Sequence, residues 1–247
     1  MARAVRGLWL VIALAAAPAH AGPPYLTDDP APTDTSHWEI YNYVQGLGDP
    51  AGLGGEGGLD LNYGAAKDLQ LTAVLPLAWQ NPNGGLGSGL RAGPGTIELA
   101  AKYRFLHQSA GSWTPDVSVF PRFFVPTVAR FGTGRLDLLL PVWGQKDFGK
   151  WSVFAGGGYQ IDPGAGQMNF WQGGIALDRQ VTHAFHLGAE LFSAGRASLT
   201  TSGYTTLDFA STLRLTPHWS LLASSGPLWE PGGGRGEVFY LSLKADY

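Results

Sequence analysis

Apolar and polar residues alternate with a period of two over most of this chain. In residues 69–79, leucine, alanine and tryptophan recur at every second position. Residues 97–105 repeat the pattern, with Glu98, Lys102 and Arg104 on the polar face. Because successive side chains of a strand point to opposite faces, this period predicts β-strands. A helical period is not sustained in any stretch, so the chain is predicted to be all-β.

The alternation divides the chain into twelve segments. Most of them are close to the ~9–11 residues that a tilted strand needs to cross a bilayer. An even number of strands puts both ends of a barrel on one side, as in bacterial single-chain barrels. The predicted segments are 37–45, 55–65, 69–79, 95–106, 113–125, 134–144, 151–161, 169–179, 184–193, 203–215, 218–226 and 237–247.

Alternation alone also fits a soluble β-sandwich, whose strands are apolar toward the core. The connections between the segments favour a membrane barrel instead. Those after even-numbered segments are mostly tight, such as 66–68 and 180–183, whereas 81–94 and 227–236, after odd-numbered segments, are longer and rich in glycine. Short periplasmic turns opposite longer outer loops are typical of outer-membrane barrels.

Aromatic residues and charges support the same prediction. An aromatic girdle belongs at the membrane interface, and a charge facing lipid at mid-strand costs ~2–4 kcal/mol for Arg or Lys. The predicted charges at mid-strand all fall on the polar face. One end of the apolar face carries Trp38, Tyr63, Phe105, Trp113, Trp151, Phe185, Trp219 and Tyr247.

The N-terminus has the pattern of a secretory signal peptide. Arg3 and Arg6 precede the apolar run "LWLVIALAAA", and "AHA" at residues 19–21 is a small-residue cleavage signal. We therefore expect residues 1–21 to be cleaved, residues 22–36 to form a periplasmic leader and residues 37–247 to form the barrel. The bacterial outer membrane is the expected location. The amphipathic last segment, "FYLSLKADY", resembles the signal that outer-membrane assembly machinery reads.

Composition narrows the function classes. Charged residues make up only 14% of the 247 residues, and the net charge of −3 offers no basic footprint for nucleic acid. The chain has no cysteine, which points mildly away from disulfide-rich secreted domains. The expected partners are outer-membrane lipid, the assembly machinery and a small-molecule solute.

The leader and first strand contain the stretch "YLTDDPAPTDTSHWEIY", whose carboxylates and histidine suggest a metal or acid/base site. A proline-rich extended leader gives such groups little of the positioning that catalysis needs. We instead expect Asp28 and Asp29 to enter the lumen as a plug or gate and to pair with inward arginines such as Arg104 or Arg122.

No catalytic, cofactor or metal motif is recognised elsewhere. An outer-membrane hydrolase is the main enzymatic alternative, but His107, His183 and His186 have no serine at an evident spacing. The prediction is that the chain is not an enzyme and needs no cofactor.

The charges on the polar face are candidates for the lumen. They are either a salt-bridged network that satisfies buried charge or a polar constriction that selects solutes, and both readings remain open. Three glycines, Gly156–Gly158, allow barrel curvature or, alternatively, room for a plug. The candidate lumen-lining residues are Glu98, Lys102, Arg104, Arg122, Asp137, Asp208, Arg214 and Lys244.

Several motifs resemble one family over nearly the whole expected mature chain. They are "GPPYLTDDPAPTDTSHWEIY", "LNYG", "LQLTAVLPLAW", "ELAAKYRF", "VFPRFFVPT", "LPVWGQKDFGKW", "GGGYQIDPG" and "RQVT". Together they resemble the outer-membrane transporter family named for the meta-pathway of phenol degradation. The resemblance implies a β-barrel that passes small aromatic or hydrophobic compounds, and it carries over no site residues.

Two functions remain at this stage. The first is passive transport of small, aromatic or hydrophobic solutes through the lumen of an up-and-down barrel of about twelve strands. The alternative is a barrel that transports nothing and serves a structural, adhesive or enzymatic role. An open lumen favours transport, and a packed lumen favours the alternative.

Overall fold

The computed structural model describes residues 24–49, 52–82, 89–127 and 134–247. The expected signal peptide, residues 1–21, lies outside the described residues. Within the described ranges no helix is long and apolar enough to cross a membrane.

The regular structure of the described residues consists of fourteen strands in one sheet. These strands are β1 (Trp38–Asp49), β2 (Gly52–Ala66), β3 (Leu69–Asn81), β4 (Arg91–Pro94), β5 (Ile97–Leu106), β6 (Asp116–Val119), β7 (Arg122–Val125), β8 (Asp137–Phe148), β9 (Trp151–Ile161), β10 (Phe170–Gln180), β11 (Phe185–Ala194), β12 (Tyr204–Arg214), β13 (Trp219–Trp229) and β14 (Arg235–Asp246).

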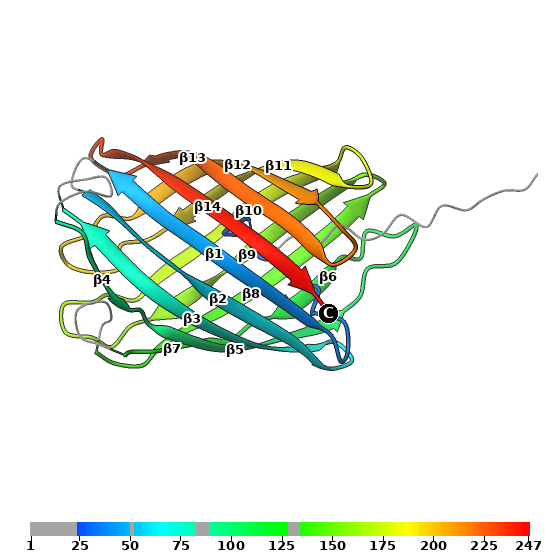
Figure 1. Cartoon of the computed structure of the whole chain (residues 1–247), viewed down its shortest axis with the longest axis horizontal. Coiled ribbons are helices and arrows are strands. Elements are labelled where there is room, and N and C mark those ends of the chain that lie inside the picture. Colours follow the sequence, from blue (N-terminus) through cyan, green and yellow to red (C-terminus); the bar gives the residue numbers. More distant parts are fainter. Residues whose placement is uncertain (1–23, 50–51, 83–88, 128–133) are drawn as a thin grey trace, which may run out of the picture.

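The sheet closes into a barrel because β1 pairs antiparallel with β14, as Figure 1 shows. Two of the wall strands are interrupted. β4 and β5 both pair with β3, and β6 and β7 both pair with β8, so each couple acts as one wall strand. The fourteen strands therefore make a wall of twelve, which confirms the predicted antiparallel barrel and its segments.

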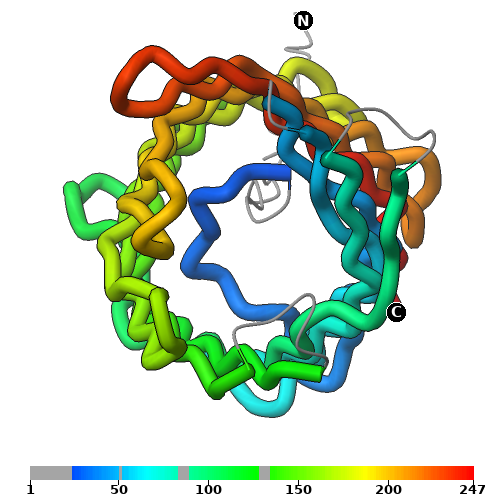
Figure 2. The backbone as a smooth tube through the Cα atoms, turned by 90° about the vertical axis from the view of Figure 1, so that its left-hand side faces the viewer, coloured from blue at the N-terminus to red at the C-terminus, as the bar shows by residue number. Residues whose placement is uncertain are grey.

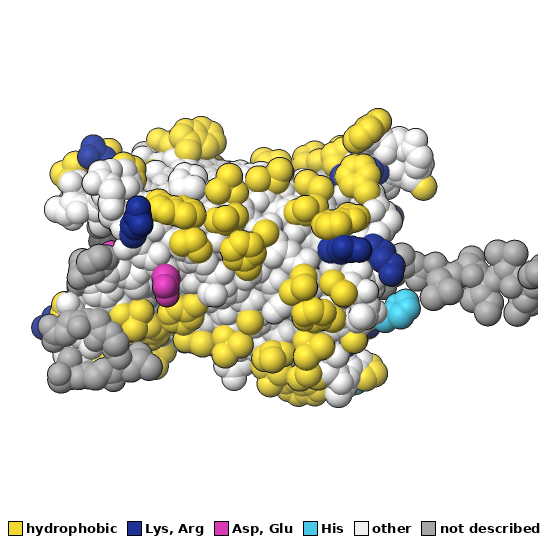
Figure 3. All heavy atoms as spheres, turned by 90° about the horizontal axis from the view of Figure 1, so that it is seen from above, with side chains coloured by type: hydrophobic (Ala, Val, Ile, Leu, Met, Phe, Trp, Pro, Cys, Tyr) yellow, Lys and Arg dark blue, Asp and Glu magenta, His cyan; other side chains and the backbone are white. Residues whose placement is uncertain are grey.

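The period of two sets which side chains face out. On β3, Leu71 and Leu75 are 48% and 46% exposed, whereas Gln70 and Thr72, on either side of Leu71, are buried toward the lumen. The same contrast recurs around the wall, so the outer surface is apolar. In Figure 3 hydrophobic side chains cover much of the visible face, and its few charged side chains lie toward the two ends of the barrel. A surface of this kind is suited to lipid.

The two ends of the barrel differ as the sequence predicts. β2–β3, β8–β9, β10–β11 and β12–β13 are joined by turns of two to four residues, whereas the longer connections mostly lie at the other end. At the end with the short turns, Trp38 packs against Tyr63 with ring centroids 4.7 Å apart. Trp113 is 85% exposed there and lies beside Phe148. These rings are placed as an interfacial girdle requires.

The interior is packed on one side by the leader, residues 24–36. Figure 2 shows this segment, in dark blue, running inside the barrel rather than beneath it. Tyr25 of the leader joins Phe154, Ala176 and Ala210 of the wall in one buried apolar cluster. The barrel core is thus partly supplied by residues that precede the first strand.

Candidate functional site

The leader crosses the lumen as an extended segment, so its backbone N–H groups need acceptors from the wall. The carboxylate of Glu190, on β11, supplies two of them. Its Oε2 accepts the N–H of Leu26 at 2.8 Å, and its Oε1 accepts the N–H of Thr27. Further along, Gln70 Oε1 accepts the N–H of Thr33 at 2.8 Å. These amide contacts fix the leader at two points of its path.

The first described residues of the leader are anchored to side chains on β13 and β10. The hydroxyl of Ser224, on β13, donates to the carbonyl of Pro24 at 2.8 Å. The phenol of Tyr25 donates to Asp178 Oδ1 at 3.0 Å, and His186 Nδ1 lies 2.8 Å from the other oxygen of Asp178. Burial and the neighbouring Asp178 raise the pKa of the Tyr25 phenol above its usual value, so it remains a donor.

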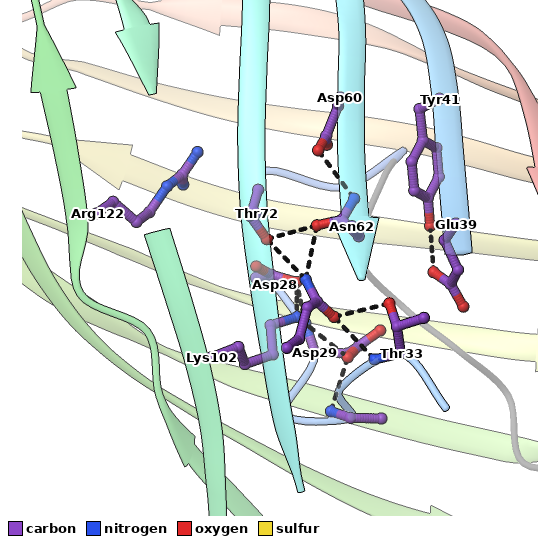
Figure 4. A network of polar contacts seen from close by, with 12 residues as sticks. Asp28, Asp29, Thr33, Glu39, Tyr41, Asp60, Asn62, Thr72, Lys102 and Arg122 are labelled. Carbon is purple, nitrogen blue, oxygen red and sulfur yellow. Dashed lines mark hydrogen bonds and ion pairs between the residues drawn. The ribbon is translucent and has the colours of Figure 1, made fainter. Parts of the chain in front are cut away.

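Asp28 and Asp29 meet a single buried base at the middle of the leader. Lys102 Nζ lies 3.0 Å from Asp28 Oδ1 and 3.5 Å from Asp29 Oδ1. Burial raises the pKa of the Asp29 carboxyl to about 7, although Lys102 opposes the shift. Figure 4 shows this ion-paired group beside a polar network in which Thr72 donates to Asn62. The amide of Gln70 also donates to Asn62.

The predicted partners of the leader were wrong. Arg104 lies at the rim, where it pairs with Asp68 at 3.0 Å and approaches Asp116 at 3.8 Å. Arg122 forms two 2.7 Å hydrogen bonds to the carboxylate of Glu98. Both arginines already have carboxylate partners on the wall, so the leader pairs instead with Lys102.

The wall makes room for the leader at glycines, but not at the patch singled out from the sequence. A β-carbon added at Gly156, Gly157 or Gly158 would have its three nearest atoms on the neighbouring strands β8 and β10. At Gly174 it would lie 2.5 Å from Thr27 Oγ1, and at Gly188 it would collide with the phenol oxygen of Tyr25. The bare surface that accommodates the leader is therefore on β10 and β11, and also at Gly64 of β2, where an added β-carbon would collide with the carbonyl of Asp34.

Beside the leader lies a cavity of about 600 Å³ that follows the lumen along β1 from Glu39 to Leu47. Four of the predicted lumen residues line it, and both aspartates of the predicted plug line it as well. These residues are Glu98, Lys102, Arg122, Asp208, Asp28 and Asp29. The leader thus forms part of the wall of the cavity.

The other four predicted lumen residues lie away from this cavity. Asp137 is buried at the start of β8. Arg214 ends β12 and is exposed, and Arg104 is at the rim. Lys244 pairs with Glu39 at 3.1 Å and with Asp246 at 2.9 Å, close to the mouth where β14 ends.

Sequence reasoning missed an important anchor of the leader. Glu190 has the parity of the inner face but is not among the candidate lumen-lining residues, and it is only 1% exposed. The sequence feature that could have identified Glu190 is a carboxylate at mid-strand beside a glycine-containing stretch. Among the described residues, no group of three or more His, Asp or Glu side chains could hold a metal ion.

No protein-family model and no curated protein sequence matches the chain. Its fold is similar to that of a solved outer membrane channel from Pseudomonas putida F1, with a TM-score of 0.68 and 17% sequence identity over 92% of this chain and 99% of that one. It is also similar to the KdgM porin in complex with disordered oligogalacturonate, with a TM-score of 0.53 and 13% identity over 82% of this chain and 97% of that one. The chain therefore has the barrel fold of outer membrane channels, and its apolar outer wall places it in the bacterial outer membrane.

Proposed function

We propose that the chain is a passive channel for small solutes and that its leader is a plug in the lumen. The observation that carries the proposal is the cavity of about 600 Å³ beside the leader. Ligand sites in proteins commonly have ~300–1,000 Å³, so the cavity accommodates a small molecule. A barrel filled by its own wall side chains would leave no such space.

The leader is built to occupy the lumen specifically. Its backbone is held by Glu190 and Gln70, and its acidic side chains by Lys102. Contacts to both the backbone and the acidic side chains support a plug that is docked in the lumen, rather than a tether that has no fixed position there. The sequence resemblance implies membership in a family of transporters for aromatic or hydrophobic compounds. We include this membership in the proposal.

The residues that line the cavity indicate which class of solute it accepts. Oligogalacturonate, present in the complex of the KdgM porin, is an acidic sugar polymer. The cavity of the present chain is lined by carboxylates such as Glu56, Asp60 and Glu98, which would repel it. Tyr41, Tyr43 and Phe120 give the same cavity aromatic surface. Small solutes with an apolar or aromatic part suit this wall better than acidic sugars.

The alternative is a barrel that transports nothing, and the buried leader is the observation in its favour. Thr27 is fully buried, and Pro30 is less than 2% exposed. Liposomes that contain the purified protein separate the two functions when they are swollen with neutral and aromatic solutes of increasing size. The matched variant lacks residues 24–33 and keeps the first strand.

A channel predicts faster swelling than empty liposomes for the intact protein, and faster still for the leader-deleted variant. If both proteins behave as empty liposomes while migrating as heat-modifiable barrels on a detergent gel, the transport function is rejected. If deletion changes nothing in a permeable barrel, the plug role is rejected while the channel role stands.

A further inference from the structure

The lumenal cavity carries a marked excess of negative charge. Seven carboxylate side chains line it, against two basic ones, Lys102 and Arg122. The carboxylates are those of Asp28, Asp29, Glu39, Glu56, Asp60, Glu98 and Asp208. Low-dielectric walls around charge of one sign concentrate the field within such a space.

Both basic groups of the cavity are already engaged. Arg122 holds Glu98 through Nε and Nη2, each at 2.7 Å. Lys102 is shared between Asp28 and Asp29. An anionic solute entering the cavity would therefore have to displace an internal carboxylate before it met a positive charge.

Three of the carboxylates accept their hydrogen bonds from neutral groups within the described part of the chain. Glu56 accepts from the phenol of Tyr43 at 3.1 Å and from the amide of Gln45 at 2.9 Å. Asp60 accepts from Asn62 at 2.8 Å. Asp208, on β12, accepts from the hydroxyl of Thr206 at 2.9 Å. These donors orient the carboxylates without neutralising them.

Aromatic rings complete the wall of the cavity. Tyr43 and Tyr240 are stacked with ring centroids 6.2 Å apart, and both line the space together with Tyr41 and Phe120. The ring of Phe120 already attracts internal cations, since Lys102 Nζ lies 4.9 Å from its centroid. The negative face of an aromatic ring attracts organic cations as well.

We propose that the lumen selects cations over anions, that its preferred solutes are small organic cations such as alkylammonium ions, and that Glu56, Asp60 and Asp208 determine this selectivity. The proposal rests on the proposed channel function and deepens it by naming the solute class. Rings of Asp and Glu side chains act in this way in cation-selective pores. The carboxylates supply the attraction, and the rings provide an apolar surface for the alkyl part.

Reversal potentials in planar bilayers test the proposal, measured at pH 8 across gradients of KCl and of tetramethylammonium chloride. We expect cations to be favoured over chloride by about tenfold. The triple variant Glu56→Gln, Asp60→Asn, Asp208→Asn should reduce this ratio severalfold. The matched control is Glu237→Gln, an exposed position on β14 that does not line the cavity, and it should leave the ratio unchanged.

A second measurement tests the proposal through binding and does not require ion flux through the barrel. Saturation-transfer NMR with tetramethylammonium and with methanesulfonate, on folded protein in detergent, reports occupancy of the cavity. A signal for the cation that the triple variant loses supports the proposal. An equal or stronger signal for the anion overturns it.

The outcomes for the proposed function and for selectivity are distinct. Conductance without cation preference, or with a preference that the triple variant keeps, rejects the selectivity and leaves the channel intact. Absence of conductance and of swelling rejects the channel, and the NMR comparison then decides whether the cavity prefers cations.

Discussion

Glu190, at mid-strand on β11, accepts the backbone N–H of Thr27 in the leader, although 163 positions separate the two residues in the chain. The carboxylate is buried and its second oxygen accepts the adjacent N–H of Leu26. A buried carboxylate satisfied by two backbone donors is a strong, directional contact. It makes Glu190 one of the main anchors of the leader.

We predict that Glu190→Gln loosens the leader. Glutamine has one carbonyl oxygen for two donors, and its NH₂ group faces an N–H, so docking should weaken by ~1–3 kcal/mol. The chain has no cysteine, so Thr27→Cys gives a single reporter at a fully buried position. Labelling of this cysteine by a maleimide should be about tenfold faster in the Glu190→Gln background.

The control for this labelling is Ser202→Cys, at an exposed position between β11 and β12, which should react equally fast with and without Glu190→Gln. Equal rates at Thr27→Cys in the two backgrounds would show that Glu190 does not hold the leader.

We predict that Lys102→Met releases the leader and that Arg104→Met does not. Removing Lys102 leaves Asp28 and Asp29 buried without a counter-charge, and breaking a buried ion pair commonly costs ~3–5 kcal/mol. Arg104 pairs with wall carboxylates at the rim. The Thr27→Cys reporter should label faster in the first variant only.

The double change Asp28→Asn, Asp29→Asn provides the complementary test. Added to Lys102→Met, it removes the uncompensated charge and should bring labelling back toward the rate of the intact leader. Faster labelling in Arg104→Met than in Lys102→Met would contradict the pairing seen in the structure.

We predict that docking of the leader depends on pH through Asp29. Its pKa rises from the usual 3.8 to about 7 when burial in the docked leader disfavours the carboxylate. The docked state therefore binds a proton more tightly than the released state, and docking weakens as the pH rises from about 4 to about 7. Labelling at Thr27→Cys, normalised to Ser202→Cys, should be slower at pH 5.5 than at pH 8.

Asp29→Asn removes this titration, so the normalised labelling rate of that variant should be flat across the same range. A pH dependence that persists unchanged in Asp29→Asn would assign the effect to another group.

We predict that Leu241→Arg destabilises the barrel while a lumenal change at the same height is tolerated. Leu241 faces outward at mid-strand on β14 and is 47% exposed, so an arginine there would face lipid at a cost of ~2–4 kcal/mol. Thermal unfolding followed by the heat-dependent gel shift should show a lower midpoint. The lumenal control is Ser224→Thr on β13, whose hydroxyl faces the leader.

The sequence by itself determined the barrel. Alternation of apolar and polar positions is a local property, and in a membrane it fixes which face of each strand meets lipid, so all twelve wall strands were located. The same parity placed Glu98, Lys102 and Asp208 on the inner face, where they line the cavity. The acidic residues of the leader led separately to the expectation that it enters the lumen.

Only the tertiary structure decided how the inner face is used. Parity says that Lys102, Arg104 and Arg122 point inward, but it says nothing about which carboxylate lies within reach of each. Pairing of β5 with β7 brings Glu98 to Arg122, and pairing of β3 with β5 brings Asp68 to Arg104, which leaves Lys102 for the leader. Glu190 and Gly188 also acquire their roles from the tertiary structure, because β11 contacts the leader only inside the folded barrel.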